Sequence, residues 1–298
     1  MSHLFNPLVT AEQLYQRRTH NDLPVELQDR IRFDTARLTH SAGILLRLPQ
    51  DITAQANVLL FRYWTVDNLR DHEFNDASAA TIYLTAKISA SPRSLRSVAN
   101  VYKYLLTADH DSSSTKSAPH SYESHARGYY FTEGEYQSLR GRLLTLEGQI
   151  LNALGFNTHV ALPHPLAITY LQTLDIFSPS IPKHAATEIS QRTVQYLNTA
   201  LMSPQMLYLT HQPPSLATAA IYLAAKEVGV TLPDVEWWEV FDCEREELGF
   251  LVMAMGSLDA IARGYQERDG AKGMITRMAI DNENRRSSLE TDNTTPRV

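Results

Sequence analysis

An alanine-rich segment of eleven residues occurs twice in this chain, and this repeat constrains the possible folds more than any other feature. The copy ASAATIYLTAK at 77–87 matches LATAAIYLAAK at 216–226, with six identical positions at an offset of 139 residues. Each copy is apolar on nearly every side, which is typical of a helix at the centre of a bundle. Self-similarity of this kind indicates that one structural unit is used twice.

Helical periodicity surrounds both copies, so each half of the chain is predicted to contain five helices. The helices expected in the first half are 25–47, 51–64, 77–87, 94–106 and 132–154. Those expected in the second half are 165–177, 185–202, 215–228, 235–241 and 244–261. Pro49 is expected to end the first helix, and Gly155 is expected to end the fifth. Few stretches show a strand pattern, so the predicted fold class is all-α, with two consecutive five-helix repeats.

The composition divides the chain into four parts. They are an N-terminal extension (1–24), a first repeat (25–160), a second repeat (161–264) and a disordered C-terminal tail (265–298). The tail prediction rests on the absence of aromatic residues from 267 onward. An insertion at about 107–131 is rich in serine, histidine and charge, so it is predicted to be an exposed or disordered loop. Its histidines have neither helical spacing nor neighbouring cysteines, so no metal site is predicted.

Charge and composition exclude several classes of function. The 298 residues include 27 Lys and Arg against 33 Asp and Glu, and this net charge of −6 argues against direct DNA binding through a basic surface. Cys243 is the one cysteine, so neither a disulfide framework nor a cysteine-rich zinc site is expected. No apolar run reaches the roughly 18 residues of a membrane span, and no secretory signal is recognised. We therefore expect a cytosolic or nuclear protein that does not enter a membrane.

Catalytic motifs are missing from the sequence. The chain lacks the phosphate-binding-loop, dinucleotide-binding, zinc-protease, serine-nucleophile and kinase catalytic-loop patterns. The acidic neighbours of Cys243 in FDCEREE are expected to raise the pKa of its thiol, which disfavours a nucleophilic role. We therefore expect a protein that is not an enzyme and that needs no cofactor.

Two charged residues lie where their helices are otherwise apolar. Lys87 ends the first alanine-rich copy, where the partial negative charge at a helix C-terminus explains a cation. Glu147 has Leu143, Leu144 and Leu151 at helical spacing, so its carboxylate lies beside an apolar stripe. Such a carboxylate is either paired in the interior or placed at the rim of a patch that meets a partner. The helical pattern leaves both interpretations open.

Several segments together resemble the cyclin family. The third helix ends in LTAK (84–87), and the fifth reads LExxILxxLGF (146–156), as in a cyclin box. Within the family the chain is most similar to the L-type cyclins, which are tied to transcription and pre-mRNA splicing. The segments that carry this similarity are SAGILLRLPQ (41–50), PHPLAITYLQTLD (163–175) and IYLAAKEVGVTLP (221–233). The resemblance covers roughly residues 25–262.

The resemblance implies a mechanism. Cyclins have no active site; they activate a cyclin-dependent kinase by packing against its regulatory helix. The family's charged pair that faces the kinase falls on Lys87 and Glu147, and the flanking apolar contacts would be Leu84, Ile88, Leu151 and Phe156. An L-type cyclin implies a PITSLRE-type kinase as partner, in the nucleus. It also implies a role in transcription by RNA polymerase II and in pre-mRNA splicing, with splicing or transcription factors as further partners.

The chain departs from the family pattern in three places. Ile88-Ser89-Ala90 replaces the acidic pair that follows the lysine in many cyclins. The first helix lacks the MRAIL-type sequence that docks substrates in cell-cycle cyclins. The C-terminal tail also lacks the long Ser/Arg-rich region of animal L-type cyclins. Substrate docking through that first helix and targeting through that tail are therefore not expected.

Two other classes of function are compatible with the same repeat. The replaced acidic pair leaves open a scaffold that has cyclin folds but no kinase partner. A general transcription factor of the IIB type also uses two similar five-helix repeats, on DNA, although the negative net charge and the missing zinc ribbon argue against it. Binding of a kinase, of nucleic acid or of neither would separate the three.

Overall fold

The computed structural model describes residues 5–20, 23–113, 130–269, 276–277 and 280, and the regular elements within these residues are all helices. The first half contains α1 (Ala11–His20), α2 (Val25–Leu45), α3 (Gln50–Val66), α4 (Phe74–Ile88), α5 (Leu95–Ser113) and α7 (Glu133–Ala153). The second half contains α8 (Pro163–Thr173), α9 (Lys183–Ala200), α10 (Leu207–Thr210), α11 (Pro213–Val228), the 3-10 turn η1 (Glu239–Phe241) and α12 (Arg245–Asp269). None of the helices in these ranges is both long enough and apolar enough to cross a membrane.

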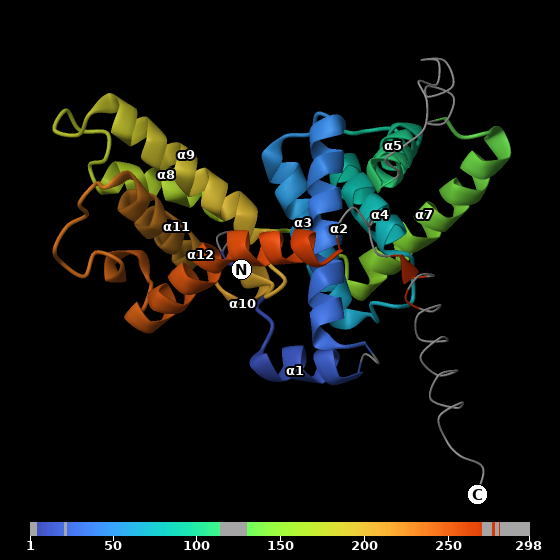
Figure 1. The fold of residues 1–298 in the computed structure, drawn as a ribbon, viewed down its shortest axis with the longest axis horizontal. Helices are drawn as coiled ribbons and strands as arrows, with labels where there is room; N and C mark the ends of the chain where they lie inside the picture. Colours follow the sequence, from blue (N-terminus) through green and yellow to red (C-terminus); the bar gives the residue numbers. More distant parts are fainter. Residues whose placement is uncertain (1–4, 21–22, 114–129, 270–275, 278–279, 281–298) are drawn as a thin grey trace, which may run out of the picture.

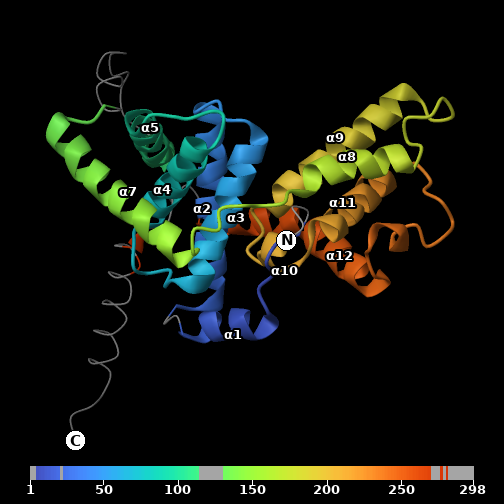
Figure 2. The ribbon, with the colours of Figure 1, turned by 180° about the vertical axis from the view of Figure 1, so that it is seen from behind.

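Two helical bundles lie side by side along the long axis of the molecule (Figures 1 and 2). The first is built from α2, α3, α4, α5 and α7, and the second from α8, α9, α11 and α12. α4 packs against all four other helices of its bundle, and α11 packs against the other three of the second. The predicted all-α fold with two consecutive helical repeats is confirmed.

The two alanine-rich copies form the central helices. Ala80 in α4 and Ala219 in α11 occupy equivalent places in the repeat, and both are 0% exposed. Small side chains let the surrounding helices approach closely, and the interior is packed too densely to accept larger ones there without strain. The alanine-rich repeat in the sequence therefore marks the central helix of each bundle, the one that packs against all the others.

Helix ends in the first bundle follow the sequence signals. Beyond the end of α2 the chain turns through Arg47, whose φ of 51° is left-handed. The backbone N–H of Leu48 donates to the carbonyl of Gly43 at 3.0 Å, which closes the turn in the Schellman pattern just before Pro49. α7 ends at Ala153, and Gly155, two residues later, turns the chain with a left-handed φ of 55°, as predicted.

The fourth helix expected in the second repeat does not form. In place of a helix over 235–241 there is only the 3-10 turn η1, and Asp242 leaves it with a left-handed φ of 54°. Phe241 is 6% exposed, and its ring stacks on that of Tyr170 with centroids 3.9 Å apart. These aromatic contacts hold the segment in a conformation that is not an α-helix, so the helix predicted at 235–241 is wrong.

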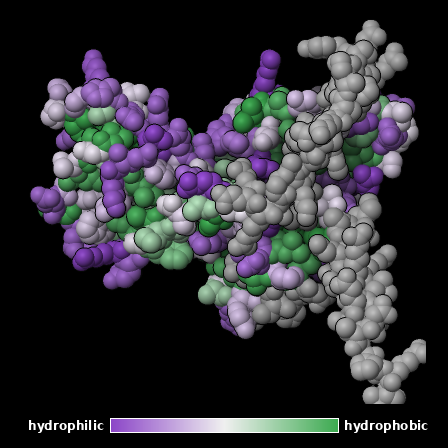
Figure 3. Space-filling view, viewed as in Figure 1, coloured by the Kyte–Doolittle hydropathy of each residue, from purple (hydrophilic) through white to green (hydrophobic). Residues whose placement is uncertain are grey.

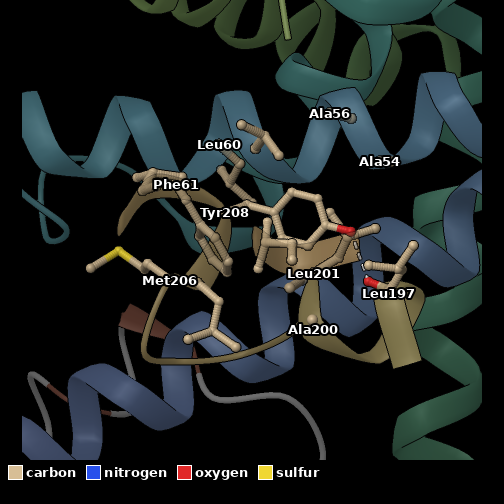
Figure 4. Close-up of a cluster of buried hydrophobic side chains, with 14 of the residues drawn as sticks. Ala54, Ala56, Leu60, Phe61, Leu197, Ala200, Leu201, Met206 and Tyr208 are labelled. Atoms are coloured by element: carbon tan, nitrogen blue, oxygen red, sulfur yellow. Dashed lines mark hydrogen bonds between the residues drawn. The ribbon is translucent and has the colours of Figure 1, made fainter. Parts of the chain in front are cut away.

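The short helix α10, which the sequence did not predict, fills the junction between the bundles. Tyr208 of α10 is 2% exposed and lies against Leu60 and Phe61 of α3 (Figure 4). Its hydroxyl donates to the carbonyl of Leu197 near the end of α9, 2.9 Å away. Because these side chains belong to one continuous cluster, the hydrophobic core runs from one bundle into the other.

The predicted insertion at 107–131 is described only at its ends. Residues 114–129, which include His120 and His125, lie outside the described residues. α5 extends to Ser113, beyond the end predicted at 106. The Lys103 Nζ of α5 donates to the carbonyl of Tyr130 at 2.8 Å, so the C-terminal end of the insertion is held against α5.

The predicted tail is described at its start and at three further positions. α12 continues to Asp269, so the boundary predicted at 265 lies inside a helix. The guanidinium of Arg277 donates to the carbonyl of Asp71 at 3.0 Å, and Ile280 is 4% exposed. At these two positions the structure differs from the predicted disorder, because both side chains contact folded residues. The rest of the tail lies outside the described residues.

Burial lowers the pKa of three histidines, His40, His164 and His211. His164 lies at the junction, with its Nε2 2.9 Å from the Oδ1 of Asn198, and burial outweighs the nearby charge of Asp51. A histidine with a lowered folded-state pKa binds fewer protons when folded. Its contribution to stability is therefore complete above the unfolded pKa of about 6.5 and is lost as the pH falls below it.

We therefore expect the midpoint of thermal unfolding to fall from about pH 7 to about pH 5, and to fall less in a His164→Gln variant. The amide can keep the hydrogen bond to Asn198 but cannot titrate. Circular dichroism melts of both proteins across this pH range measure the difference. An identical pH dependence would exclude His164 as a contributor.

Candidate functional site

Lys87 and Glu147 form an ion pair between α4 and α7. The Lys87 Nζ donates a hydrogen bond to the Glu147 Oε1 at 2.9 Å. The glutamate side chain is 7% exposed, whereas the lysine side chain is 54% exposed. The pair therefore presents its positive charge at the surface and holds its negative charge below it.

Local sequence signals place both residues. Lys87 lies in the last turn of α4, where the helix carbonyls favour a cation. α7 begins with a capping box in which the Thr132 hydroxyl accepts from the Glu135 backbone and the Glu135 carboxylate accepts from the Thr132 backbone. Glu147 lies on α7 beside the stripe that this helix buries, Leu143, Leu146 and Ile150.

The buried carboxylate stabilises the charged form of the lysine. The hydrogen bond and the negative charge of Glu147 raise the pKa of Lys87, so the ammonium stays protonated. Its Nζ also lies 5.7 Å from the ring centre of Tyr83, within the range of a cation–π contact. These contacts hold a cation at a defined place on the surface.

The four apolar residues expected around the pair have different surroundings. Ile88 is 50% exposed and Phe156 is 68% exposed, so both are open to a partner. Leu151 is partly buried against the core. Leu84 is 1% exposed because its side of α4 faces the other helices of the bundle. The structure therefore corrects the expectation for Leu84, which supports the site from inside and cannot itself contact a partner.

Phe156 combines exposure with an unusual backbone. Its φ is 59°, a left-handed conformation that is uncommon for a residue with a bulky side chain. The turn is held by the Phe156 N–H, which donates to the carbonyl of Leu151 at 2.9 Å. Strained residues of this kind concentrate at functional sites, where the surrounding structure holds them in place.

Two further exposed apolar residues were missed by the sequence analysis. Ile44 is 63% exposed and Leu45 is 45% exposed at the end of α2. Arg93, in the loop after α4, donates to the carbonyl of Leu46 at 2.8 Å, so the end of α2 adjoins the loop that follows Lys87. Helical register gave a signal only for Ile44, because Leu45 lies three positions after the buried Ala42 and so on the same side of α2. Exposed apolar residues are not confined to this site, since Figure 3 shows separate hydrophobic patches on both bundles.

The second bundle has no equivalent of the pair. Lys226 occupies the same place in the repeat as Lys87, in the last turn of α11, and its side chain is exposed. Within the described residues it makes no ion pair, whereas the neighbouring Glu227 lies 3.4 Å from Arg192. The charged pair therefore distinguishes the first bundle from the second, although the two share one architecture.

The site offers charge and apolar surface rather than reactive groups. Cys243 is 2% exposed, and burial with the nearby Glu247 raises the pKa of its thiol to about 12, so it is unsuited to nucleophilic chemistry. Among the described residues, no group of three or more His, Cys, Asp and Glu side chains could hold a metal ion.

Comparisons with known proteins identify the family. No family model matches the chain. It is 33% identical over 214 residues to an uncharacterized cyclin-L1-like protein of Schizosaccharomyces pombe, covering 70% of this chain and 75% of that protein. It is 31% identical over 231 residues to Cyclin-L2 of Mus musculus. The chain belongs to the cyclin family, close to the L-type cyclins. Its two helical bundles are accordingly cyclin boxes.

The match to Cyclin-L2 covers 76% of this cyclin but 40% of the mouse protein, so the chain spans less than half of that relative. Solved structures agree on the fold. A chain of the yeast RNA Pol II CTD kinase CTDK-1 complex aligns with a TM-score of 0.63 at 10% identity, covering 85% of this cyclin and 72% of that chain. A chain of the CAK complex of Chaetomium thermophilum aligns with a TM-score of 0.59 at 14% identity, covering 85% and 76%. At these identities the likeness concerns the fold alone.

Proposed function

We propose that this cyclin binds a cyclin-dependent kinase through its first box and activates it without taking part in the chemistry. The observation that carries the proposal is the Lys87–Glu147 pair between α4 and α7, together with the exposed Ile88, which follows Lys87, and the exposed Phe156, which follows the end of α7. A fixed cation beside apolar side chains offers both orientation and buried area to a partner helix. The family membership of the chain supports the same function.

The activation would work through differential affinity. A protein kinase is active when its own catalytic Lys–Glu ion pair and its magnesium site are formed. A cyclin that packs better against this state than against the inactive one shifts the population towards it. Moving a kinase from about 1:99 to about 99:1 requires a preference of roughly 5.5 kcal/mol. Loss of one partner of a desolvated charge pair costs about 2–5 kcal/mol, which would cancel from about a third to nearly all of that preference.

We further propose that the kinase is of the PITSLRE type and that the complex acts in the nucleus, in transcription by RNA polymerase II and in pre-mRNA splicing. The similarity to L-type cyclins supports this finer assignment. Splicing or transcription factors are the further partners that such a role implies.

A scaffold without kinase activation is the second candidate, and one observation favours it. Ile88-Ser89-Ala90 offers no acidic side chain to a kinase, and the Ser89 hydroxyl donates to the carbonyl of Ala86 at 2.8 Å instead. The hydroxyl is thus used to cap α4. Loss of the acidic pair removes one kind of kinase contact, whereas Lys87 and the exposed Ile88 and Phe156 are still present.

Affinity purification of the tagged cyclin with mass spectrometry of the bound proteins tests the proposal. We expect one kinase to accompany the wild-type protein and the Lys226→Glu variant, and to be lost from Lys87→Glu. Lys226 is the matched control because it holds the same place in the second box. A kinase activity measurement on the recovered complex separates activation from mere binding. Absence of any kinase would favour the scaffold, and recovery of nucleic-acid machinery with all three proteins would favour a IIB-like factor.

A further inference from the structure

The segment before α1 crosses from one cyclin box to the other. Asn6 is 6% exposed, and Val9 donates its backbone N–H to the carbonyl of Leu209 in α10 at 2.8 Å. In both ribbon views the segment lies beside α10, between the two bundles (Figures 1 and 2). Residues 5–9 of the predicted N-terminal extension therefore lie against both bundles.

Asn6 makes five hydrogen bonds to three separate parts of the fold. Its backbone N–H donates to the Gln212 Oε1 at 3.0 Å, and its carbonyl accepts from the Gln212 Nε2 at 3.0 Å. Its side-chain amide pairs in the same reciprocal way with the backbone of Ala161, at 2.8 Å and 2.9 Å. Its Oδ1 also accepts from the Arg62 guanidinium at 3.0 Å. Arg62 belongs to the first box, Ala161 to the linker and Gln212 to the N-cap of α11 in the second box.

Arg62 depends on this arrangement. It is 7% exposed, and within the described residues no carboxylate pairs with it. Its charge is held by the Asn6 Oδ1 and by the carbonyl of His159 at 2.7 Å. Burial lowers the pKa of its guanidinium to about 10, which still leaves it charged at neutral pH. A buried cation needs such oxygen partners, so the first box is incomplete at this point without residue 6.

An asparagine side chain suits this position better than other polar residues do. The pairing with Ala161 requires one acceptor and one donor side by side, which a carboxamide supplies and a carboxylate or hydroxyl does not. The pairing with Gln212 uses only the backbone of residue 6 and needs the segment to stay extended beside α11. This short segment therefore contacts both boxes and the linker.

We propose that residues 5–9 form a strap that locks the two cyclin boxes in one relative orientation. Changes in this segment, or in the side chains of the boxes that it contacts, would release the second box to move against the first. The proposal does not depend on the kinase function, because the strap lies at the box junction whereas Lys87 and Glu147 lie on α4 and α7.

Hydrogen exchange on the full chain tests the strap at its own contacts. In Asn6→Ala we expect the Ala161 amide, which donates to the Asn6 Oδ1, to exchange at least about 100-fold faster, while amides within α4 keep their wild-type rates. The matched control is Gln13→Ala. Gln13 is exposed and, in the part of the chain that the structure describes, its side chain bonds to Thr10 alone, so this substitution alters the same terminal segment and leaves the strap's own hydrogen bonds in place. Equal exchange at Ala161 in wild type and Asn6→Ala would overturn the proposal, as would the same acceleration in Gln13→Ala.

A distance measurement tests the orientation itself. Ser138 on α7 and Thr187 on α9 are exposed, and their cysteine variants accept spin labels while the buried Cys243 does not react. Electron–electron resonance should give a narrow inter-box distance distribution in the wild-type background and a broader one with Asn6→Ala. Should that variant fail to fold, Gln212→Ala removes the two hydrogen bonds between the strap and the N-cap of α11, leaves those to Arg62 and Ala161, and is expected to broaden the distribution in the same way. A narrow, unchanged distribution in a folded strap variant would exclude a locking role.

Discussion

Exchanging the two charges of the Lys87–Glu147 pair is expected to keep this cyclin folded while weakening its association with the kinase about thirtyfold or more. In the double variant Lys87→Glu with Glu147→Lys, opposite charges still meet between α4 and α7, so most of the stability lost in either single reversal should return. The surface would then present an anion where the wild type presents a cation. Loss of a desolvated charge contact costs about 2–5 kcal/mol, which corresponds to a roughly thirtyfold or greater loss of affinity.

Paired measurements separate the structural role of the pair from its binding role. Thermal unfolding of the two single variants and the double variant reports the structural role, and titration with the purified kinase reports the binding role. We expect the double variant to recover thermal stability but not affinity for the kinase. Full recovery of kinase affinity in the double variant would mean that the pair only stabilises the first box.

Replacing Gly43 by alanine is expected to destabilise the first box by about 2–3 kcal/mol, the upper part of the range for overpacking a core. Gly43 lies in the last turn of α2, where Thr53 of α3 packs against it. A methyl group at Gly43 would lie 2.3 Å from the Thr53 Oγ1 and 2.6 Å from its Cγ2. Threonine is branched at its β-carbon and has little freedom to turn away, so α2 and α3 would have to separate. Urea unfolding followed by circular dichroism measures the loss.

Two control variants make this result specific. Gly141 lies inside α7 of the same box, and a methyl group there would meet nothing within 4 Å. Gly141→Ala should therefore stabilise the box by up to about 1 kcal/mol, because alanine is the better helix former. Adding Thr53→Ala to Gly43→Ala should recover part of the loss, a non-additivity expected only for residues in contact. An effect of Gly43→Ala no larger than that of Gly141→Ala would show that the two helices can adjust freely.

Local signals accounted for the parts of the fold that a short stretch of sequence controls. The alanine-rich repeat identified both central helices, and Gly155 ended α7 as expected because a left-handed residue there favours glycine. Helical spacing also placed Glu147 beside an apolar stripe, but it did not show which residue pairs with the carboxylate. The resemblance to cyclins pointed to Lys87, and the 2.9 Å contact between the two confirms that they pair.

Contacts between distant residues decided the rest. Residues 235–241 have an apolar spacing compatible with a helix, yet the stacking of Phe241 on Tyr170 holds them in another path. Leu84 carries the same apolar signal as Ile88, and only the packing around α4 buries one and exposes the other. No local pattern marks Asn6, whose bonding partners lie 56 to 206 positions away along the chain.

By itself, then, the sequence determined that this protein is a pair of helical repeats, which helices lie at their centres and where two unusual charges stand on them. Periodicity, capping and small side chains act over a few residues, so they can be read from the chain directly. The tertiary structure alone decided which apolar residues remain open to a partner, how closely α2 approaches α3 at Gly43, and that the N-terminal segment joins the two boxes. Each of these features depends on contacts between residues that are far apart in the sequence. The sequence alone does not give the distances between such residues in the folded protein.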